Sequence, residues 1–237
     1  MSNDNDTNDY SDWLDKYYDR FDYSDFTVLE KIDTGSSAQI KIATIKDIKD
    51  PKFVLKCFNY DKITLKGIVN EIQLQRQVNY HPNIIRLYGI TKDPISLVLE
   101  YADGGTLQNY LQNPIKELKW DERFDLAFQI ASATSCLHHH NIIHCDLHAA
   151  NILVHQNKIK LADFGQSVEA SSSSSLMCQI KGGKREEIIE GTPTVYSDLY
   201  ERCWKYEPDE RPDIQKVVSI LKKELGKLFT NSITTYL

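Results

Sequence analysis

Hydrophobic residues recur in five short runs within the first half of the chain. Each run is rich in β-branched and other apolar residues, which is typical of strands. The runs are Phe26–Ile32, Ile40–Ile45, Phe53–Phe58, Ile85–Ile90 and Ile95–Glu100. Between the third and fourth runs the apolar positions follow helical spacing over Ile63–Val78. The first half therefore predicts a β-sheet accompanied by one helix.

The hydrophobic pattern of the second half predicts helices and one hairpin. Apolar residues at helical spacing mark four segments. They are Leu107–Leu111, Trp120–His138, Thr194–Tyr206 and Ile214–Leu228. The hairpin is predicted from the apolar run Ile152–Val154 and the apolar-polar alternation over Ile159–Leu161. The low-complexity run Ser171–Ser175 is interpreted as a mobile loop.

The N-terminal segment has a pattern of its own. Residues 1–9 are rich in Asn and Asp, and we expect them to be disordered. A short amphipathic helix is predicted after Ser11, either as a prop packed on the folded domain or as a docking helix for a partner. Its apolar positions are Trp13, Leu14, Tyr17, Tyr18 and Phe21.

Composition narrows the class of protein. The chain has 237 residues, which is enough for one domain or two small lobes. Its formal net charge is -6, and no basic patch indicates nucleic acid as a partner. No apolar run has the length of a membrane span. The N-terminus is acidic and lacks a basic region and an apolar run, so we do not expect it to be a secretory signal. Five scattered cysteines without a CxxC pair indicate reduced thiols and a cytoplasmic protein.

Two acids and an amide surround the predicted hairpin. Asn151 lies five positions after Asp146, and Asp163 lies twelve after Asn151. Phosphoryl transfer from ATP uses one carboxylate to orient the attacking hydroxyl, with an amide oxygen and a second carboxylate to hold Mg²⁺. On His144–Val154 and Ala162–Gly165 the chain resembles the eukaryotic protein kinase superfamily.

The resemblance implies a bilobal α+β fold, with a five-stranded N-lobe carrying one helix and a mainly helical C-lobe. It implies ATP and Mg²⁺ as cofactors, a protein substrate, Asp146 as the base, and Asn151 and Asp163 as metal ligands. The expected division is an N-terminal segment at 1–25, an N-lobe at 26–102 and a C-lobe at 103–237. Oligomeric state is left open.

Lys56 lies within an apolar predicted strand, where a lone ammonium group is costly unless it is paired. Glu71 follows fifteen residues later in the predicted helix. The resemblance makes the two a pair that positions the α- and β-phosphates. Taken alone, they would equally suit an edge-strand lysine and a solvated glutamate.

The nucleotide-binding residues are assigned by resemblance. Only Gly35 remains of the three glycines in the phosphate-covering loop, so we expect weakened ATP affinity. Ile40 occupies the valine position of the same motif. The backbone of Glu100 and Ala102 is expected to bind the adenine edge, and Asp103 to reach the ribose.

The catalytic loop departs from the kinase pattern at two positions. Cys145 replaces the arginine that receives a phosphorylated activation loop, which argues against that route of activation. His148 replaces the lysine of most Ser/Thr kinases. The sequence of Leu147–Asn151 is closer to tyrosine kinases, and the segment from Gly183 to Pro193 resembles tyrosine-kinase-like proteins. The choice between Ser/Thr and Tyr stays open.

The chain after the Asp-Phe-Gly motif is too short for a complete kinase. Cys203–Pro212 matches a C-lobe pattern, but the Ala-Pro-Glu element and the central helix are missing before it. We interpret this as an internal deletion that truncates the C-lobe. The faces of Trp120–His138 and Thr194–Tyr206 must then pack together or stay exposed, and we expect disorder over Ser167–Gly191. The alternative function is a pseudokinase or deletion product, a nucleotide- or partner-binding module without turnover.

Overall fold

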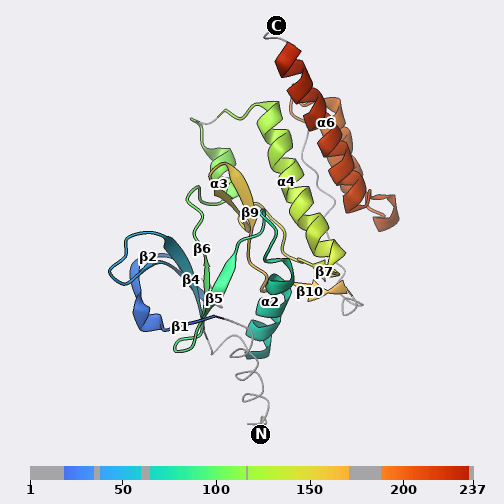
Figure 1. Ribbon diagram of the computed structural model, residues 1–237. Coiled ribbons are helices and arrows are strands. Elements are labelled where there is room, and N and C mark those ends of the chain that lie inside the picture. The colour runs from blue at the N-terminus through green and yellow to red at the C-terminus, as the bar shows by residue number, and fades with distance from the viewer. Residues whose placement is uncertain (1–18, 35–37, 60–64, 116, 171–187, 235–237) are drawn as a thin grey trace.

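The computed structural model describes residues 19–34, 38–59, 65–115, 117–170 and 188–234, which form two lobes (Figure 1). A β-sheet with one helix forms the first lobe, and the second is mainly helical, which confirms the predicted α+β class. The first lobe contains β1 (Arg20–Phe21), a 3-10 turn (Tyr23–Asp25), β2 (Phe26–Thr34), β3 (Ala38–Ile45), β4 (Lys52–Phe58), α2 (Leu65–Val78), β5 (Leu87–Thr91) and β6 (Ser96–Glu100). The second contains α3 (Leu107–Gln112), α4 (Trp120–His139), β7 (Ile142–Ile143), β8 (Ile152–His155), β9 (Lys158–Leu161), β10 (Val168–Glu169), α5 (Thr194–Cys203), a 3-10 turn (Pro208–Glu210) and α6 (Ile214–Thr234).

The sheet of the first lobe has the strand order β1-β5-β6-β4-β3-β2. The five predicted strands are present and pair antiparallel. A sixth strand, β1, pairs in parallel with β5 and places Phe21 opposite Thr91. The predicted N-terminal helix is therefore wrong at Phe21, and its other residues lie outside the described part of the chain. The close approach of β1 requires Gly89, where a Cβ atom would collide with the Asp19 carbonyl.

The sheet buries side chains on both faces because successive residues of a strand point to opposite sides. Helix α2 covers one face, where Ile68 packs in one cluster with Leu97. An aromatic cluster covers the other, with the rings of Phe26 and Phe53 edge to face at 5.9 Å. Since Phe53 lies on the aromatic face, alternation along β4 directs Lys56 toward α2.

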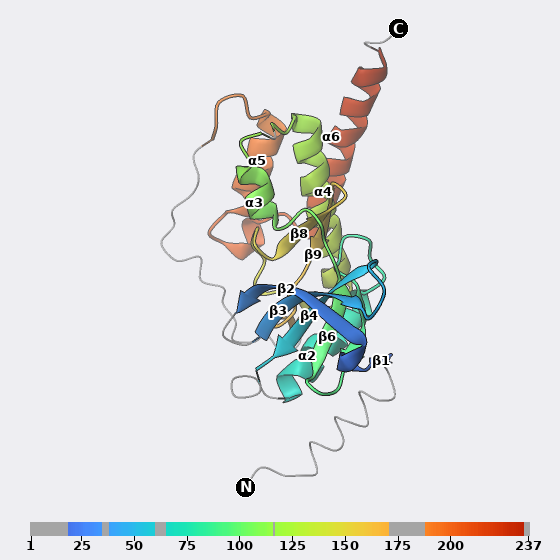
Figure 2. The same cartoon turned by 90° about the vertical axis from the view of Figure 1, so that its left-hand side faces the viewer.

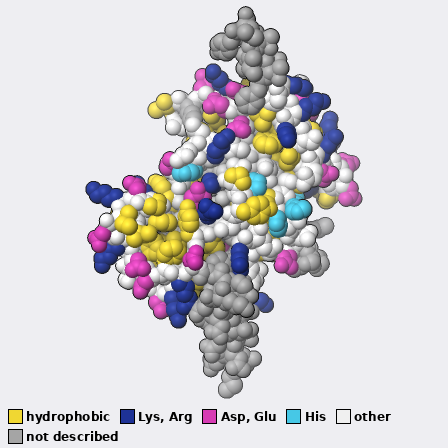
Figure 3. Space-filling model, in the orientation of Figure 1, with side chains coloured by type: hydrophobic (Ala, Val, Ile, Leu, Met, Phe, Trp, Pro, Cys, Tyr) yellow, Lys and Arg dark blue, Asp and Glu magenta, His cyan; other side chains and the backbone are white. Residues whose placement is uncertain are grey.

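Strand β2 forms one edge of this sheet and remains apolar on its surface. Val28, Leu29 and Ile32 are all exposed, and Figure 3 shows hydrophobic side chains gathered over this lobe. An edge strand presents unpaired backbone groups. This edge therefore combines exposed apolar side chains with backbone groups that no further strand of the described sheet pairs.

A second core joins the lobes. Leu74 and Val78 from α2 belong to the same buried cluster as Leu137 of α4 and Leu161 of the β8–β9 hairpin. Phe164 lies in this cluster and is fully buried. The hairpin is therefore fixed between α2 and α4, which determines where the residues on either side of it lie.

Helices α4, α5 and α6 pack together in one hydrophobic cluster of the second lobe (Figure 2). The Tyr196 ring of α5 meets the Trp120 and Phe124 rings of α4 at 5.4 and 5.2 Å, so these two helix faces pack directly together. The packing is incomplete, because cavities of about 440 and 400 Å³ flank the contact, both lined in part by Ala127 and Tyr196.

Several predictions fall on residues outside the described part. They concern Gly35, the run Ser171–Ser175 and most of the segment Ser167–Gly191. The prediction of disorder is wrong at Val168–Glu169, because these residues form β10 and pair with β7. Within the described ranges, no helix is long and apolar enough to cross a membrane.

Candidate active site

Lys56, Glu71 and Asp163 meet between the two lobes. The Nζ atom of Lys56 lies 2.6 Å from Glu71 Oε1 and 2.8 Å from Asp163 Oδ1. Strand β4 supplies Lys56, helix α2 supplies Glu71, and Asp163 follows β9. The Glu71 side chain is only 2% exposed, so it lies where an unpaired carboxylate would be strongly unfavourable. The Lys56 ammonium group therefore forms ion pairs with both carboxylates.

The two carboxylates keep Lys56 charged. Burial lowers the pKa of Lys56, but Glu71 and Asp163 together raise this pKa by more, so that it lies above its ordinary value. Burial likewise raises the pKa of Asp163, but Lys56 and a hydrogen bond from the Gly165 N–H outweigh it and hold that pKa below its usual range. Both groups are thus ionised at neutral pH.

The backbone around Asp163 is shaped for this contact. Asp163 has a φ of 63°, which residues other than glycine rarely adopt. At Gly165, an added Cβ atom would lie 3.2 Å from Asp163 Oδ1 and 3.4 Å from Glu71 Oε2. The turn therefore leaves little room for any side chain but hydrogen, and it directs the Asp163 carboxylate toward Lys56.

Asp146 and Asn151 lie in the loop between β7 and β8. The Asn151 Nδ2 group donates to the Asp146 carbonyl at 3.0 Å and to Asp146 Oδ2 at 2.9 Å. Because the amide nitrogen is used in this way, the oxygen Oδ1 is the atom that Asn151 can offer to a cation. The Ala162 N–H donates to the Asn151 carbonyl at 2.9 Å. The structure thus brings Asn151 next to the segment that carries Asp163.

His144 is a site residue to which the sequence motif assigned no role. It is 4% exposed, its Nε2 lies 3.1 Å from the Ala162 carbonyl, and its ring packs on Phe164 with centroids 5.4 Å apart. Burial lowers the pKa of His144, which favours the neutral ring. His144 therefore ties the loop of Asp146 to the segment of Asp163. The signal in the sequence is a histidine directly after the apolar pair Ile142–Ile143.

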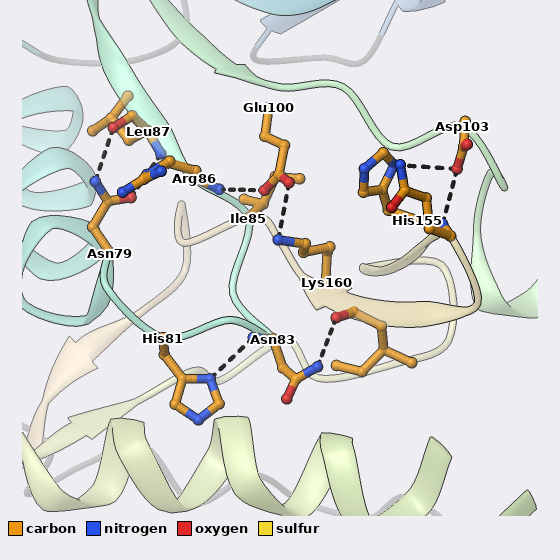
Figure 4. A network of polar contacts seen from close by, with 12 residues as sticks. Asn79, His81, Asn83, Ile85, Arg86, Leu87, Glu100, Asp103, His155 and Lys160 are labelled. Atoms are coloured by element: carbon orange, nitrogen blue, oxygen red, sulfur yellow. Dashed lines mark hydrogen bonds and ion pairs between the residues drawn. The ribbon is translucent and has the colours of Figure 1, made fainter. Parts of the chain in front are cut away.

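Glu100 ends β6 where the chain passes between the lobes (Figure 4). Its carboxylate pairs with Lys160 Nζ at 2.9 Å and accepts from the Arg86 N–H at 3.2 Å. The Glu100 N–H donates to the Arg86 carbonyl at 2.9 Å, so this backbone N–H is already bonded within the protein. The ion pair with Lys160 could not be predicted, because alternation assigns Lys160 to a face of β9 without naming its partner.

Asp103 contacts the turn of the β8–β9 hairpin (Figure 4). Its Oδ1 accepts from the Gln156 N–H at 3.2 Å and lies 3.2 Å from His155 Nδ1. The Gln156 bond is the main reason that the pKa of Asp103 lies below its ordinary value. The Asp103 side chain remains 53% exposed. It therefore holds the hairpin turn while staying open to solvent beside Ala102.

Ile40 lies opposite Lys56 in the β3–β4 ladder, and directly paired residues share a face of the sheet. It therefore lies on the side of the sheet that carries Lys56. The described part of the site thus contains an ammonium group held by two carboxylates, and next to it an acid paired with an amide. Oxygen donors of this kind suit Mg²⁺, and the cation suits phosphate. Fold and site together are those of a protein kinase domain.

Comparison with known proteins agrees with this class. The family model described as "Protein kinase domain" matches residues 26–185. The chain therefore belongs to the protein kinase family. The match ends before α5 and α6 begin.

Two relatives are serine/threonine kinases by name. The chain is 38% identical over 117 residues to a "Probable serine/threonine-protein kinase kinX" of Dictyostelium discoideum, covering 47% of this chain and 11% of the relative. It is 36% identical over 146 residues to "Serine/threonine-protein kinase SIK1" of Mus musculus, covering 59% of this chain and 18% of the relative. The matched region is therefore a small part of each relative.

Proposed function

We propose that this chain transfers the γ-phosphoryl group of ATP to a hydroxyl group of a protein. The observation that carries the proposal is the contact of Lys56 with both Glu71 and Asp163, because it joins a phosphate-binding cation to a metal-binding carboxylate. Most of the catalysis in such a site is positioning and charge stabilisation. The residues of this chain supply both.

Each residue has a distinct role in the proposal. Asp146 accepts the proton of the attacking hydroxyl, and its bond from Asn151 fixes the carboxylate. Lys56 binds phosphate oxygens, while Glu71 keeps the ammonium group in place. Asn151 Oδ1 and the Asp163 carboxylate would hold Mg²⁺, which when bound neutralises charge on the phosphate oxygens.

The nucleotide would lie between the lobes. Ile40 would cover the base from the sheet, with the backbone of Glu100 and Ala102 at its edge. Asp103 would reach the ribose with the oxygen that does not hold Gln156. The loop around Gly35 lies outside the described residues and is assigned to the phosphates by motif alone.

The acceptor is proposed to be serine or threonine, since both named relatives are serine/threonine kinases. The alternative acceptor, tyrosine, rests on the sequence of Leu147–Asn151, which resembles that of tyrosine kinases. A cytoplasmic location is proposed from the cysteines, since the four in the described residues form no disulfide. Phosphoamino-acid analysis of a labelled substrate distinguishes the two acceptors.

The decisive experiment measures both binding and transfer. Mg-ATP should raise the melting temperature by mass action, and labelled phosphate should pass from γ-labelled ATP to a generic protein substrate. Asp146→Asn should retain the thermal shift and lose the transfer. A folded sample with neither shift nor transfer at millimolar Mg-ATP contradicts the proposal.

A second candidate function is a nucleotide- or partner-binding module without turnover. It is favoured by the end of the family match before α5 and by the direct packing of α5 on α4, which leaves no central helix between them. This candidate predicts a thermal shift with Mg-ATP and no transfer, even with several unrelated protein substrates. The same experiment therefore separates the two functions.

A further inference from the structure

His148 is held in one tautomer by its own loop. The Ala150 N–H donates to His148 Nδ1 at 3.2 Å. A nitrogen that accepts a hydrogen bond carries no proton, so the neutral ring has its proton on Nε2. The backbone therefore determines which ring nitrogen can donate.

That nitrogen lies close to the Asp146 carboxylate. His148 Nε2 lies 3.5 Å from Asp146 Oδ1, and Asn151 Nδ2 lies 2.9 Å from Asp146 Oδ2. The two oxygens of Asp146 therefore have different neighbours, one on each side. The distance from His148 is long for a hydrogen bond, but contacts of catalytic groups commonly tighten only when the substrate is bound.

We propose that His148 is a positioning residue that sets the rotation of the Asp146 carboxylate together with Asn151. The inference rests on the proposed function, in which Asp146 receives the hydroxyl proton. With Oδ2 bonded to Asn151, donation from His148 to Oδ1 fixes the carboxylate plane. Each oxygen keeps a further lone pair, so Oδ1 can still accept from a substrate hydroxyl.

A different role for His148 would be direct contact with the transferred phosphate. That role predicts an effect on the KM for ATP, because phosphate binding contributes to the ground-state complex. A positioning role predicts an effect on kcat with an unchanged KM for ATP, because the carboxylate acts in the transition state. Steady-state kinetics therefore separates the two roles.

Two substitutions divide the functions of the ring. His148→Asn retains an acceptor for the Ala150 N–H, since asparagine bonds a backbone N–H two residues on, but it cannot reach Asp146 as a donor. His148→Gln reaches Asp146 as a donor and gives up the loop bond. We expect kcat to fall about tenfold in His148→Asn, the scale of a hydrogen bond to a charged group, and to be largely retained in His148→Gln. His139→Asn, an exposed site on α4, is the control and should match the wild type.

A measurement that needs no turnover keeps this inference separate from the proposed function. In nitrogen NMR of the intact protein, His148 should show a bare Nδ1 and a protonated Nε2, and Asp146→Asn should shift the Nε2 signal. If transfer is absent but this pattern is found, the proposed function fails and the contact stands. A proton on Nδ1, an unaltered kcat in His148→Asn, or a loss confined to the KM for ATP overturns the inference.

Discussion

The Lys56 ammonium group lies 2.8 Å from the Asp163 carboxylate, although 107 positions separate the two residues in the chain. The contact crosses from the sheet of the first lobe to the loop after β9. The same ammonium group also neutralises Glu71, which is buried. One lysine thus links the arrangement of the two lobes to the charge balance of the site.

Replacing Lys56 should therefore affect both folding and nucleotide binding. Lys56→Met leaves the buried Glu71 carboxylate without its cation, and breaking a buried ion pair costs roughly 3–5 kcal/mol. Urea denaturation should show this loss, and Mg-ATP should no longer raise the melting temperature. The double variant Lys56→Met with Glu71→Leu should recover part of the stability without recovering the shift. If Lys56→Met is as stable as the wild type, Lys56 does not stabilise the buried Glu71 carboxylate.

Gly89 should be intolerant of any side chain, because β1 lies directly over it. In Gly89→Ala the added methyl group would meet the Asp19 carbonyl and lie 2.8 Å from the Phe21 ring. Strand β1 must then move and weaken the bond from the Ile90 N–H to the Asp19 carbonyl. We expect the free energy of unfolding to fall by about 1–3 kcal/mol and hydrogen exchange at the Ile90 amide to become faster.

A second glycine provides the control. At Gly226, within α6, an added Cβ atom would meet nothing within 4 Å. Gly226→Ala should therefore stabilise the protein by up to about 1 kcal/mol, because alanine is the better helix former. Destabilisation at Gly226 comparable to that at Gly89 would show that the effect at Gly89 does not depend on β1.

His81 should make the stability depend on pH. Its Nδ1 accepts from the Asn83 N–H at 3.2 Å, as Figure 4 shows, and its Nε2 lies 3.3 Å from Ser132 Oγ on α4. Burial lowers the pKa of His81 below its ordinary value of 6.5. Its contribution to stability is thus fully present above about pH 6.5 and is lost as the pH falls through the lower pKa of the folded state.

Urea denaturation between pH 8 and pH 5 checks this dependence. His81→Asn retains an acceptor for the Asn83 N–H but does not titrate, so its loss of stability over this range should be smaller than that of the wild type. The control variant His139→Asn should lose as much stability between pH 8 and pH 5 as the wild type. An identical pH profile for His81→Asn would show that His81 does not contribute.

The elements of the fold could be predicted from the sequence because their apolar periods are regular. The five runs became β2 to β6, and helices α2 and α4 begin within two residues of their predicted starts. Strand β1 was missed because its two residues have no pattern of their own. It exists only because Gly89, far along the chain, allows a second backbone to approach.

The motif brought Asp146, Asn151 and Asp163 to attention, but the motif does not contain the contacts that hold them. The bond between His144 and the Ala162 carbonyl joins two segments through a buried ring. The ion pair of Glu100 with Lys160 joins the end of β6 to β9. Both depend on how the hairpin lies between α2 and α4, which a periodic pattern does not specify.

Helix α5 should open before the rest of the protein. Two cavities of about 440 and 400 Å³ flank its contact with α4, and a helix with fewer buried contacts opens locally at lower free energy. In native-state hydrogen exchange, the amides of α5 should therefore exchange faster than those of α4 and of β4. Uniform protection of both lobes would contradict this expectation.

Two alanines of α4 test whether the cavities cause the opening. Ala127 lines both cavities, whereas Ala133 is fully buried in the core that joins the lobes. Ala127→Leu should fill empty space and slow the exchange of α5. Ala133→Leu adds the same atoms where no space exists, and overpacking of this kind costs about 1–3 kcal/mol. If Ala127→Leu destabilises the protein as much as Ala133→Leu, the space beside α5 is too small to explain its opening, and the weakness of this lobe must lie elsewhere.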